Sequence, residues 1–203
     1  MSGIRILIWL SATLAVICAA GLYSVNTLIH QKKIIKEETL SNLVPSFTLT
    51  AHTGEKISNE SLRGYVWIAG FFFTKCQGIC PLLEENMKTI QEAFRNQGKV
   101  KILLFSVDPK NDTRERLAQF AKKIGALDGK WYFIFGKQGE VTELSRKGFL
   151  LGATEVPGEI LHSDRFVLVD ERGFIRGYYK GTEEAEIQKL IEDTKNLLRG
   201  EKP

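Results

Sequence analysis

The chain has 203 residues, which is the length of one ordinary domain plus an additional segment. Its 28 basic and 24 acidic residues give a net charge of +4, and this near balance argues against a nucleic-acid-binding surface. The sequence contains no internal repeat and no low-complexity segment.

The N-terminal segment is apolar. No charged residue occurs from 6 to 29, a length sufficient to cross a bilayer core of about 30 Å. We therefore expect a short flank at 1–5, a transmembrane anchor or uncleaved signal at 6–29, and a polar tether at 30–44. Cys18-Ala19-Ala20 resembles a small-residue cleavage site, but the apolar run continues past it, which favours an uncleaved anchor. Cys18 is assigned no role.

The remainder of the chain, at 45–200, alternates strand patterns with helix patterns. The predicted elements are a hairpin at 47–57, a strand at 65–73, a helix after Pro81, a strand at 100–107, a helix after 112, a strand at 131–135, a short helix at 139–147, a hairpin of 166–169 and 174–179, and a helix after Thr182. Asp112 and Glu115 have the spacing of a capping box, which predicts Asp112 as a helix N-cap. This order predicts a three-layer α/β domain, matching a thioredoxin-like core with an added N-terminal β-hairpin.

Cys76 and Cys80 form a Cys-x-x-x-Cys-Pro motif where the strand pattern of 65–73 gives way to a helix pattern. Pro81 suits the first helical position, because its missing N–H would be unpaired there, so Cys80 is expected to be the N-cap. The positive end of the helix dipole favours the thiolate, which is the form that binds metal or attacks a disulfide. Metal binding, thiol redox chemistry and a structural disulfide are all consistent with this pair.

The chain has three histidines, and one of them is a candidate ligand. His30 beside the apolar segment and His52 beside the first hairpin turn are interpreted as solvated polar residues. His162 precedes the predicted strand at 165–169, and in a thioredoxin-like fold the loop before that strand packs against the cysteine motif. Thioredoxins usually carry a cis-proline in this loop, whereas the nearest proline here is Pro157. Two thiolates and one imidazole suit copper or zinc, and a set of three ligands suits a metal that is passed on.

With these cysteines and His162, the sequence resembles the Sco/SenC family of membrane-anchored, thioredoxin-fold copper proteins, which assist assembly of the copper A centre of cytochrome c oxidase. The resemblance runs from about Val44 to the C-terminal helix. Its motifs are Phe73-Thr74-x-Cys76-x-x-x-Cys80-Pro81, Ser106-Val107-Asp108-Pro109 with Asp112-Thr113, and His162-Ser163 before a Phe-x-Leu-Val-Asp strand. The resemblance implies that Cys76, Cys80 and His162 bind copper as Cu(I) or Cu(II). Two positions depart from the family pattern: Leu161 replaces a common aspartate, and Gln77 replaces a frequent proline.

The function implied by the resemblance is that of a copper chaperone rather than an enzyme. It would deliver copper to the copper A subunit of cytochrome c oxidase or a related cuproprotein, or reduce that subunit's cysteines. Oxidation of Cys76 and Cys80 to a redox-active disulfide would release the metal. The alternative is a membrane-anchored thiol–disulfide oxidoreductase, which the cysteine pair serves equally well but which His162 does not favour. No small-molecule substrate is expected.

The expected location follows from the same chemistry. A disulfide that cycles with metal loading needs an oxidising compartment in which it can persist. We therefore expect a single-pass membrane protein with its folded domain on the extracytoplasmic side, which in a bacterium is the periplasmic side of the inner membrane.

Overall fold

The computed structural model describes residues 21, 23, 24, 42–76, 78, 80–137, 139–151 and 163–201, with the main chain alone for Cys80. The chain divides into two units, Met1–Asn42 and Leu43–Pro203. Three predicted segments lie wholly or largely outside the described residues: the flank at 1–5, the transmembrane segment at 6–29 and the tether at 30–44. Within 6–29 only Gly21, Tyr23 and Ser24 are described, and they are helical. Within the described ranges, no helix combines the length and the apolar character needed to span a membrane.

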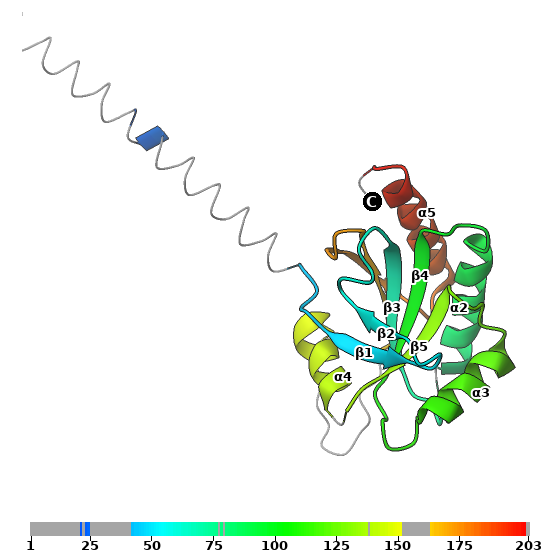
Figure 1. The fold of residues 1–203 in the computed structure, drawn as a ribbon. Coiled ribbons are helices and arrows are strands. Elements are labelled where there is room, and N and C mark those ends of the chain that lie inside the picture. The colour runs from blue at the N-terminus through cyan, green and yellow to red at the C-terminus, as the bar shows by residue number, and fades with distance from the viewer. Residues whose placement is uncertain are drawn as a thin grey trace, which may run out of the picture. The chain divides into compact units, whose positions relative to one another are not determined.

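The unit from Leu43 onward is built on a mixed sheet that has seven strands in the described part of the chain, in the order β2-β1-β5-β4-β3-β6-β7 (Figure 1). The strands are β1 (Thr48–Ala51), β2 (Lys56–Ser58), β3 (Val66–Phe72), β4 (Val100–Ser106), β5 (Trp131–Phe135), β6 (Arg165–Val169) and β7 (Ile175–Lys180). β3, β4 and β5 are parallel, whereas the hairpin β1–β2 and the hairpin β6–β7 join them antiparallel. The predicted strands and both predicted hairpins are therefore confirmed.

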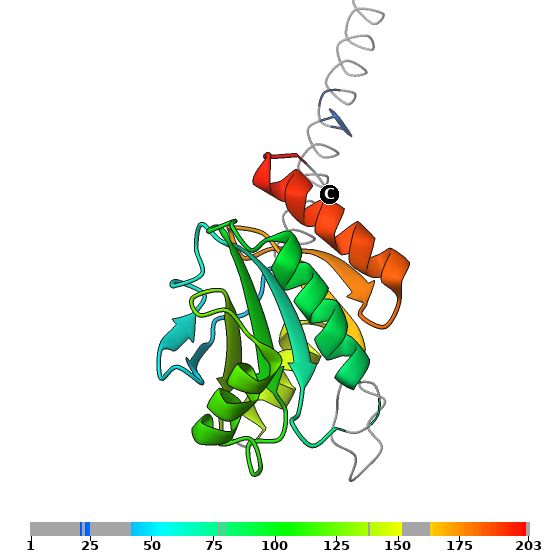
Figure 2. The same ribbon diagram turned by 90° about the vertical axis from the view of Figure 1, so that its right-hand side faces the viewer.

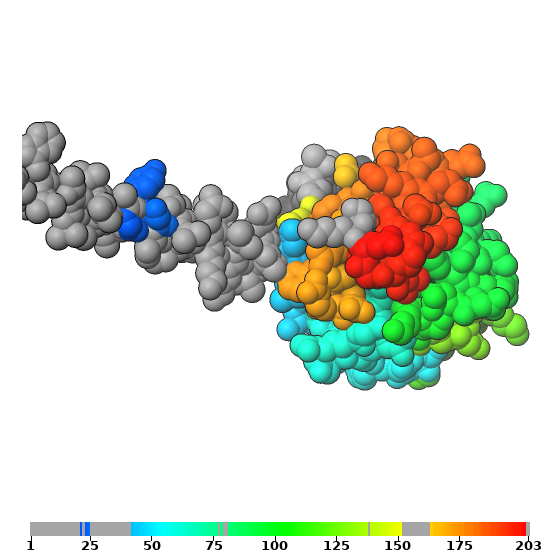
Figure 3. Space-filling model, turned by 90° about the horizontal axis from the view of Figure 1, so that it is seen from above, coloured from blue at the N-terminus to red at the C-terminus, as the bar shows by residue number. Residues whose placement is uncertain are grey.

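Helices cover both faces of this sheet (Figures 1 and 2). On one face lie α2 (Cys80–Ala93), α3 (Arg114–Ile124) and α5 (Glu184–Leu198), and on the other lie α4 (Glu140–Glu143) and the π-helical turn η1 (Leu144–Gly148). The predicted three-layer α/β architecture is confirmed. The end of α5, red in Figure 3, lies against the orange segment that contains β7.

The central strand β3 shows how the sequence produces two cores. All of its residues are buried, and their side chains alternate between the two faces. Ile68 and Phe72 pack in the core with α2, α3 and α5, to which β5 contributes Trp131, whereas Trp67 and Phe71 pack in the core with α4. A strand covered on both faces must be apolar throughout, which explains the continuous apolar run that predicted it.

Aromatic rings hold the end of β3 from both faces. The Phe71 ring stacks on Phe105 with ring centroids 5.3 Å apart and meets Phe149 edge-on at 5.2 Å. On the opposite face the Phe72 ring meets Phe133 edge-on at 5.3 Å. Such pairs contribute about 0.5–1.5 kcal/mol each beyond the area that they bury. The strand end that leads to Cys76 is therefore fixed by packing on two sides.

Two helix starts differ from their predictions. The N-cap of α3 is Thr113, whose hydroxyl oxygen accepts the N–H of Arg116 at 3.3 Å. The prediction of Asp112 as the cap was wrong, because its carboxylate is buried and accepts hydrogen bonds from distant parts of the chain. The helix α2 includes Cys80 as its first residue, so Cys80 is not an N-cap that precedes it.

His52 is buried, which contradicts its interpretation as a solvated residue. The whole residue is only 9% exposed. Its Nδ1 accepts the backbone N–H of Phe133 at 3.1 Å. The two rings meet edge-on with centroids 5.5 Å apart. Burial lowers the pKa of His52, although the charge of Asp128 opposes this shift. The neutral imidazole therefore acts as an acceptor that joins the N-terminal hairpin to β5.

The folded unit starts at Leu43, two residues before the predicted start of the domain at 45. Leu43 forms an isolated β-bridge with Phe174, and the N–H of Val44 donates to the carbonyl of Gly173 at 3.0 Å. Val44 is 2% exposed and belongs to the core with α4. These contacts join the beginning of the unit to the β6–β7 hairpin.

Candidate metal and thiol site

Cys76 lies directly beyond the carboxyl end of β3. Because β3, β4 and β5 are parallel, their carboxyl ends meet at one edge of the sheet, where α/β proteins usually place ligands. The N–H of Cys76 donates to the carbonyl of Phe73 at 3.2 Å, so Phe73–Cys76 is a β-turn with Thr74 and Lys75 at its centre. Cys76 is partly exposed and is disulfide-bonded in the structure. We call this segment the thiol turn.

The other predicted ligands are only partly within the described residues. Cys80 is the first residue of α2, and its side chain, like the whole of His162 and Cys18, lies outside the description. β6 runs antiparallel to β3 with Ala69 opposite Val167, so the start of β6 lies toward the edge at which β3 ends. Ser163 precedes that start and follows His162 in the sequence. Among the described side chains, no three of the metal-binding type converge.

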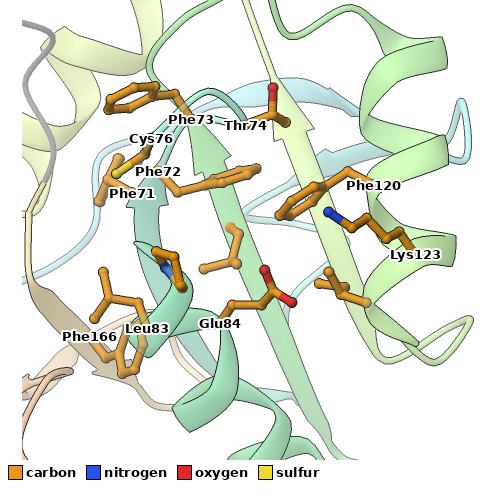
Figure 4. Close-up of a pocket in the computed structure, with 13 residues that line it drawn as sticks. Phe71, Phe72, Phe73, Thr74, Cys76, Leu83, Glu84, Phe120, Lys123 and Phe166 are labelled. Atoms are coloured by element: carbon orange, nitrogen blue, oxygen red, sulfur yellow. The ribbon is translucent and has the colours of Figure 1, made fainter. Parts of the chain in front are cut away.

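A cavity of about 160 Å³ opens beside the thiol turn (Figure 4). Its walls come from the end of β3, the turn itself, the start of α2, and α3. The residues that line it are Phe71, Phe72, Phe73, Thr74, Cys76, Pro81, Leu83, Glu84, Leu104, Phe120, Lys123, Ile124 and Phe166. Most of this lining is apolar, so the cavity can accept an apolar group from a molecule that reacts with Cys76.

Two charged side chains lie among these apolar walls. Figure 4 shows Glu84 from α2 and Lys123 from α3 extending toward the cavity from opposite sides. Glu84 also forms an ion pair with Lys88, one helical turn further along α2, with 2.9 Å between Lys88 Nζ and Glu84 Oε1. The cavity therefore combines an apolar interior with charges of both signs.

The thiol turn is bound to the buried carboxylate of Asp112. The backbone N–H of Thr74 donates to Asp112 Oδ2 at 3.1 Å, and the Thr74 hydroxyl donates to Oδ1. The hydroxyl of Ser106, the last residue of β4, donates to Oδ2 at 2.6 Å. Asp112 is 1% exposed, so these donors replace the water that its charge would otherwise require.

Further contacts join the same two segments. Arg116, in the first turn of α3, donates from Nε to the Thr74 hydroxyl oxygen at 2.6 Å and lies 3.9 Å from Asp112 Oδ1. The Lys75 ammonium donates to the side-chain oxygen of Asn111. Both central residues of the thiol turn therefore contact the loop between β4 and α3.

The sequence pattern predicted the position of Cys76, but it indicated no role for Thr74 and the wrong role for Asp112. Both residues belong to motifs shared with the family, Phe73-Thr74 before the first cysteine and Asp112-Thr113 after Ser106. The available signal was their polarity in the segments that follow two buried strands: Thr74 comes two residues after β3, and Asp112 six residues after β4. Parallel strands end at the same edge, so these residues could have been expected to meet.

Comparison with known proteins identifies the group to which this chain belongs. A family model described as SCO1/SenC matches residues 35–199. A Bacillus subtilis protein named SCO1 protein homolog is 34% identical over 164 residues, which are 79% of this chain and 85% of that protein. The chain belongs to the SCO1/SenC family. The family resemblance read from the sequence is thereby confirmed.

Solved structures agree with this assignment to the SCO1/SenC family. One, described as "Identification of a disulfide switch in BsSco, a member of the Sco family of cytochrome c oxidase assembly proteins", has 33% sequence identity and a TM-score of 0.69. It covers 78% of this chain and 95% of its own. A copper-bound structure of ScoI from Arabidopsis thaliana has 22% identity, a TM-score of 0.62 and coverage of 78% and 99%, so it shares the fold. This chain has the thioredoxin-like α/β fold of the Sco proteins.

Proposed function

We propose that this chain is a copper chaperone that holds its cargo through Cys76, Cys80 and His162. It passes copper to the copper A subunit of cytochrome c oxidase, or reduces the cysteines of that subunit to prepare them. The observation that carries this proposal is the position of Cys76, on a turn at the carboxyl end of the central strand and in the wall of an open cavity. Membership of the SCO1/SenC family supports the choice of copper and of the partner.

The donor set fits copper as cargo. Thiolates favour Cu(I), and imidazole suits copper in both oxidation states. The start of β6 lies toward the same sheet edge as the end of β3, which supports an approach of His162 to the cysteines. Three protein ligands without a fourth leave the metal open to a ligand from the receiving protein.

The proposed cycle couples copper loading to the redox state of the two cysteines. The disulfide of Cys76, for which we propose Cys80 as the partner, accepts two electrons and two protons from a dithiol, and that dithiol becomes a disulfide. The two resulting thiols lose their protons when they bind copper. The reverse reaction closes the disulfide, removes both thiolate ligands and releases the metal.

We also propose that the segment 6–29 anchors the chain in a membrane and that the folded unit faces an oxidising, extracytoplasmic space. The absence of charge over 6–29 supports the anchor. The redox cycle supports the location, because cytoplasmic thiols are kept reduced.

A second candidate function is thiol–disulfide exchange with a protein substrate. The partly exposed Cys76 beside a largely apolar cavity favours it, since such a cavity can hold a side chain next to the reacting cysteine. The two functions differ in their need for His162, which has no required role in disulfide exchange.

Copper titration of the full chain in detergent tests the proposal. A Cys18→Ser background leaves Cys76 and Cys80 as the titratable thiols. The reduced protein is expected to bind one copper per molecule, with thiolate-to-copper charge-transfer absorption in the Cu(II) form. Changing either cysteine to serine should abolish that absorption, and binding should weaken as the pH falls, because protons compete for the ligands.

Histidine variants separate the two functions. His162→Ala should weaken copper binding and change the spectrum while leaving two titratable thiols, whereas the control His30→Ala should change neither. If the His162→Ala protein binds copper with the wild-type affinity and spectrum, thiol–disulfide exchange becomes the better assignment.

A further inference from the structure

The thiol turn is held by hydrogen bonds of Thr74 with Asp112 and Arg116. Thr74 is the second residue of the turn and Cys76 is the fourth, so fixing Thr74 fixes the direction in which the chain reaches Cys76. Thr74 donates two hydrogen bonds to Asp112, and Arg116 donates to the Thr74 hydroxyl. None of these contacts involves the sulfur of Cys76, so opening its disulfide does not remove them.

Asp112 is itself held in place by further hydrogen bonds. Asp112 accepts the hydroxyl of Ser106 at 2.6 Å, and its own N–H donates to the Asp108 carbonyl at 2.9 Å. Ser106 ends β4 and pairs with Phe72, the last residue of β3. Hydrogen bonds to a buried carboxylate are stronger than those between neutral groups. The thiol turn is therefore fastened to the central strands through a charged group.

We propose that Asp112 is a positioning residue that keeps the reduced thiol turn in the geometry needed to close the disulfide and to hold copper. This inference rests on the proposed pairing of Cys76 with Cys80. A turn that stays ordered when reduced loses little conformational entropy when the disulfide closes or the metal binds. Without Asp112 the reduced turn gains freedom, and both events become less favourable.

The consequence can be measured as a redox equilibrium. Reduction by dithiothreitol converts the protein disulfide and one dithiol into two protein thiols and the cyclic disulfide of the reagent. Greater freedom of the reduced turn shifts this equilibrium toward the thiols. Asp112→Asn keeps the side-chain shape but removes the charge, so we expect the equilibrium constant for reduction to rise about three- to tenfold. For a two-electron couple, tenfold corresponds to a reduction potential about 30 mV higher.

The experiment uses the full chain with Cys18→Ser in detergent, equilibrated in dithiothreitol buffers, quenched by alkylation and counted by mass spectrometry. The matched control is Asp170→Asn. Asp170 is also buried, and it accepts the backbone N–H groups of Arg172 and Phe174 in the β6–β7 turn, both at 2.9 Å. Both variants should lower the urea midpoint, but Asp170→Asn should leave the redox equilibrium within about twofold of the wild type.

A second pair of variants covers the case in which Asp112→Asn does not fold. Thr74→Val removes the hydroxyl that donates to Asp112 while preserving the side-chain volume, and Thr74→Ser retains the hydroxyl. The valine variant should shift the redox equilibrium toward the thiols, and the serine variant should keep the wild-type equilibrium. Amide hydrogen exchange at 74–76 should also accelerate in the reduced valine variant more than in the oxidised one.

The outcomes separate this inference from the function on which it rests. If Cys76 and Cys80 of the wild type do not cycle between two thiols and a disulfide, both the positioning role and the proposed function are overturned. A wild type that does interconvert, with Asp112→Asn or Thr74→Val matching it in redox equilibrium, overturns the positioning role alone. Equal shifts for Asp112→Asn and Asp170→Asn would likewise assign the effect to general destabilisation.

Discussion

The side-chain amide of Asn86 donates to the carbonyl of Gly181 at 2.6 Å and so joins α2 to the end of β7. Gly181 in turn donates its N–H to the carbonyl of Asp164 at 2.6 Å, immediately before β6. The helix that begins with Cys80 is thereby connected to the segment that follows His162.

We expect Asn86→Ala to lower the free energy of unfolding by about 1–3 kcal/mol, because it leaves the Gly181 carbonyl without this donor. Urea unfolding followed by circular dichroism measures the change. Thr89→Ala is the control on the same helix, since the Thr89 hydroxyl donates to the Glu85 carbonyl of that helix, one turn earlier, at 3.4 Å. Equal stability losses in the two variants would contradict a role for the α2–β7 connection.

We expect Gly181→Ala to destabilise the fold by about 1–3 kcal/mol through overpacking. A Cβ at this position would lie 2.9 Å from the Asp164 carbonyl oxygen and 2.5 Å from Leu83 Cδ2. Gly98→Ala is the control, because a Cβ there meets no atom within 4 Å. Thermal unfolding of the two variants should separate them, and a Gly181→Ala protein as stable as the wild type would show that the backbone can yield there.

The stability of the folded unit should depend on pH through His52. Its pKa is lowered in the folded state, so its contribution is present above the unfolded value near 6.5 and is lost as the pH falls toward the folded value. One such group gives a slope of at most about 1.4 kcal/mol per pH unit. Urea midpoints between about pH 5 and 7.5 should be flatter for His52→Asn, which offers an acceptor but does not titrate. An unchanged slope would assign the pH dependence to other groups.

Residues 43–203 should fold without the preceding segment, because the described residues of both cores all come from this range. Circular dichroism of the truncated protein at neutral pH should show helix and strand with cooperative unfolding. Truncation to 52–203 is the comparison, since it removes β1 with buried Leu49 and Ala51 and should lower the stability. An unfolded 43–203 protein would show that the unit needs the N-terminal segment.

The C-terminus should lie on the extracytoplasmic side, because the proposed disulfide cycle requires an oxidising compartment. In a bacterial host, alkaline phosphatase fused to the C-terminus should be active, and a fluorescent protein that matures only in the cytoplasm should remain dark. The opposite pair of results would place the folded unit in the cytoplasm.

Local sequence patterns predicted most of the described architecture. The apolar spacing of Leu83, Met87 and Ile90 predicted α2, and all three side chains are buried. The continuous apolar run predicted β3, because a strand between two helical layers has no polar face. The position of Cys76 followed from where these two patterns meet. Periodicity reports which face of an element is buried, and here that was sufficient to predict α2, β3 and the junction at which Cys76 lies.

The contacts that local patterns did not reveal join residues far apart in the sequence. Asp112 has the spacing of a cap, but its hydrogen-bond partner Thr74 lies 38 residues away. His52 follows a hairpin strand and has the polarity of a surface residue, but its partner Phe133 lies 81 residues away. A polar side chain near a turn can be satisfied by water, by its own backbone or by a distant donor, and only the assembled fold decides among these.

The two tryptophans of the folded unit give each core its own optical reporter. Trp67 belongs to the core on the α4 side and meets Phe149 edge-on at 5.9 Å between ring centroids. Trp131 belongs to the core on the other side of the sheet and stacks on Phe133 at 5.5 Å. Because both indoles are fully buried, their emission should shift when the layer around each becomes hydrated. The sheet thus separates two fluorescent environments, so variants retaining one of these indoles can distinguish the loosening of one layer from the unfolding of both.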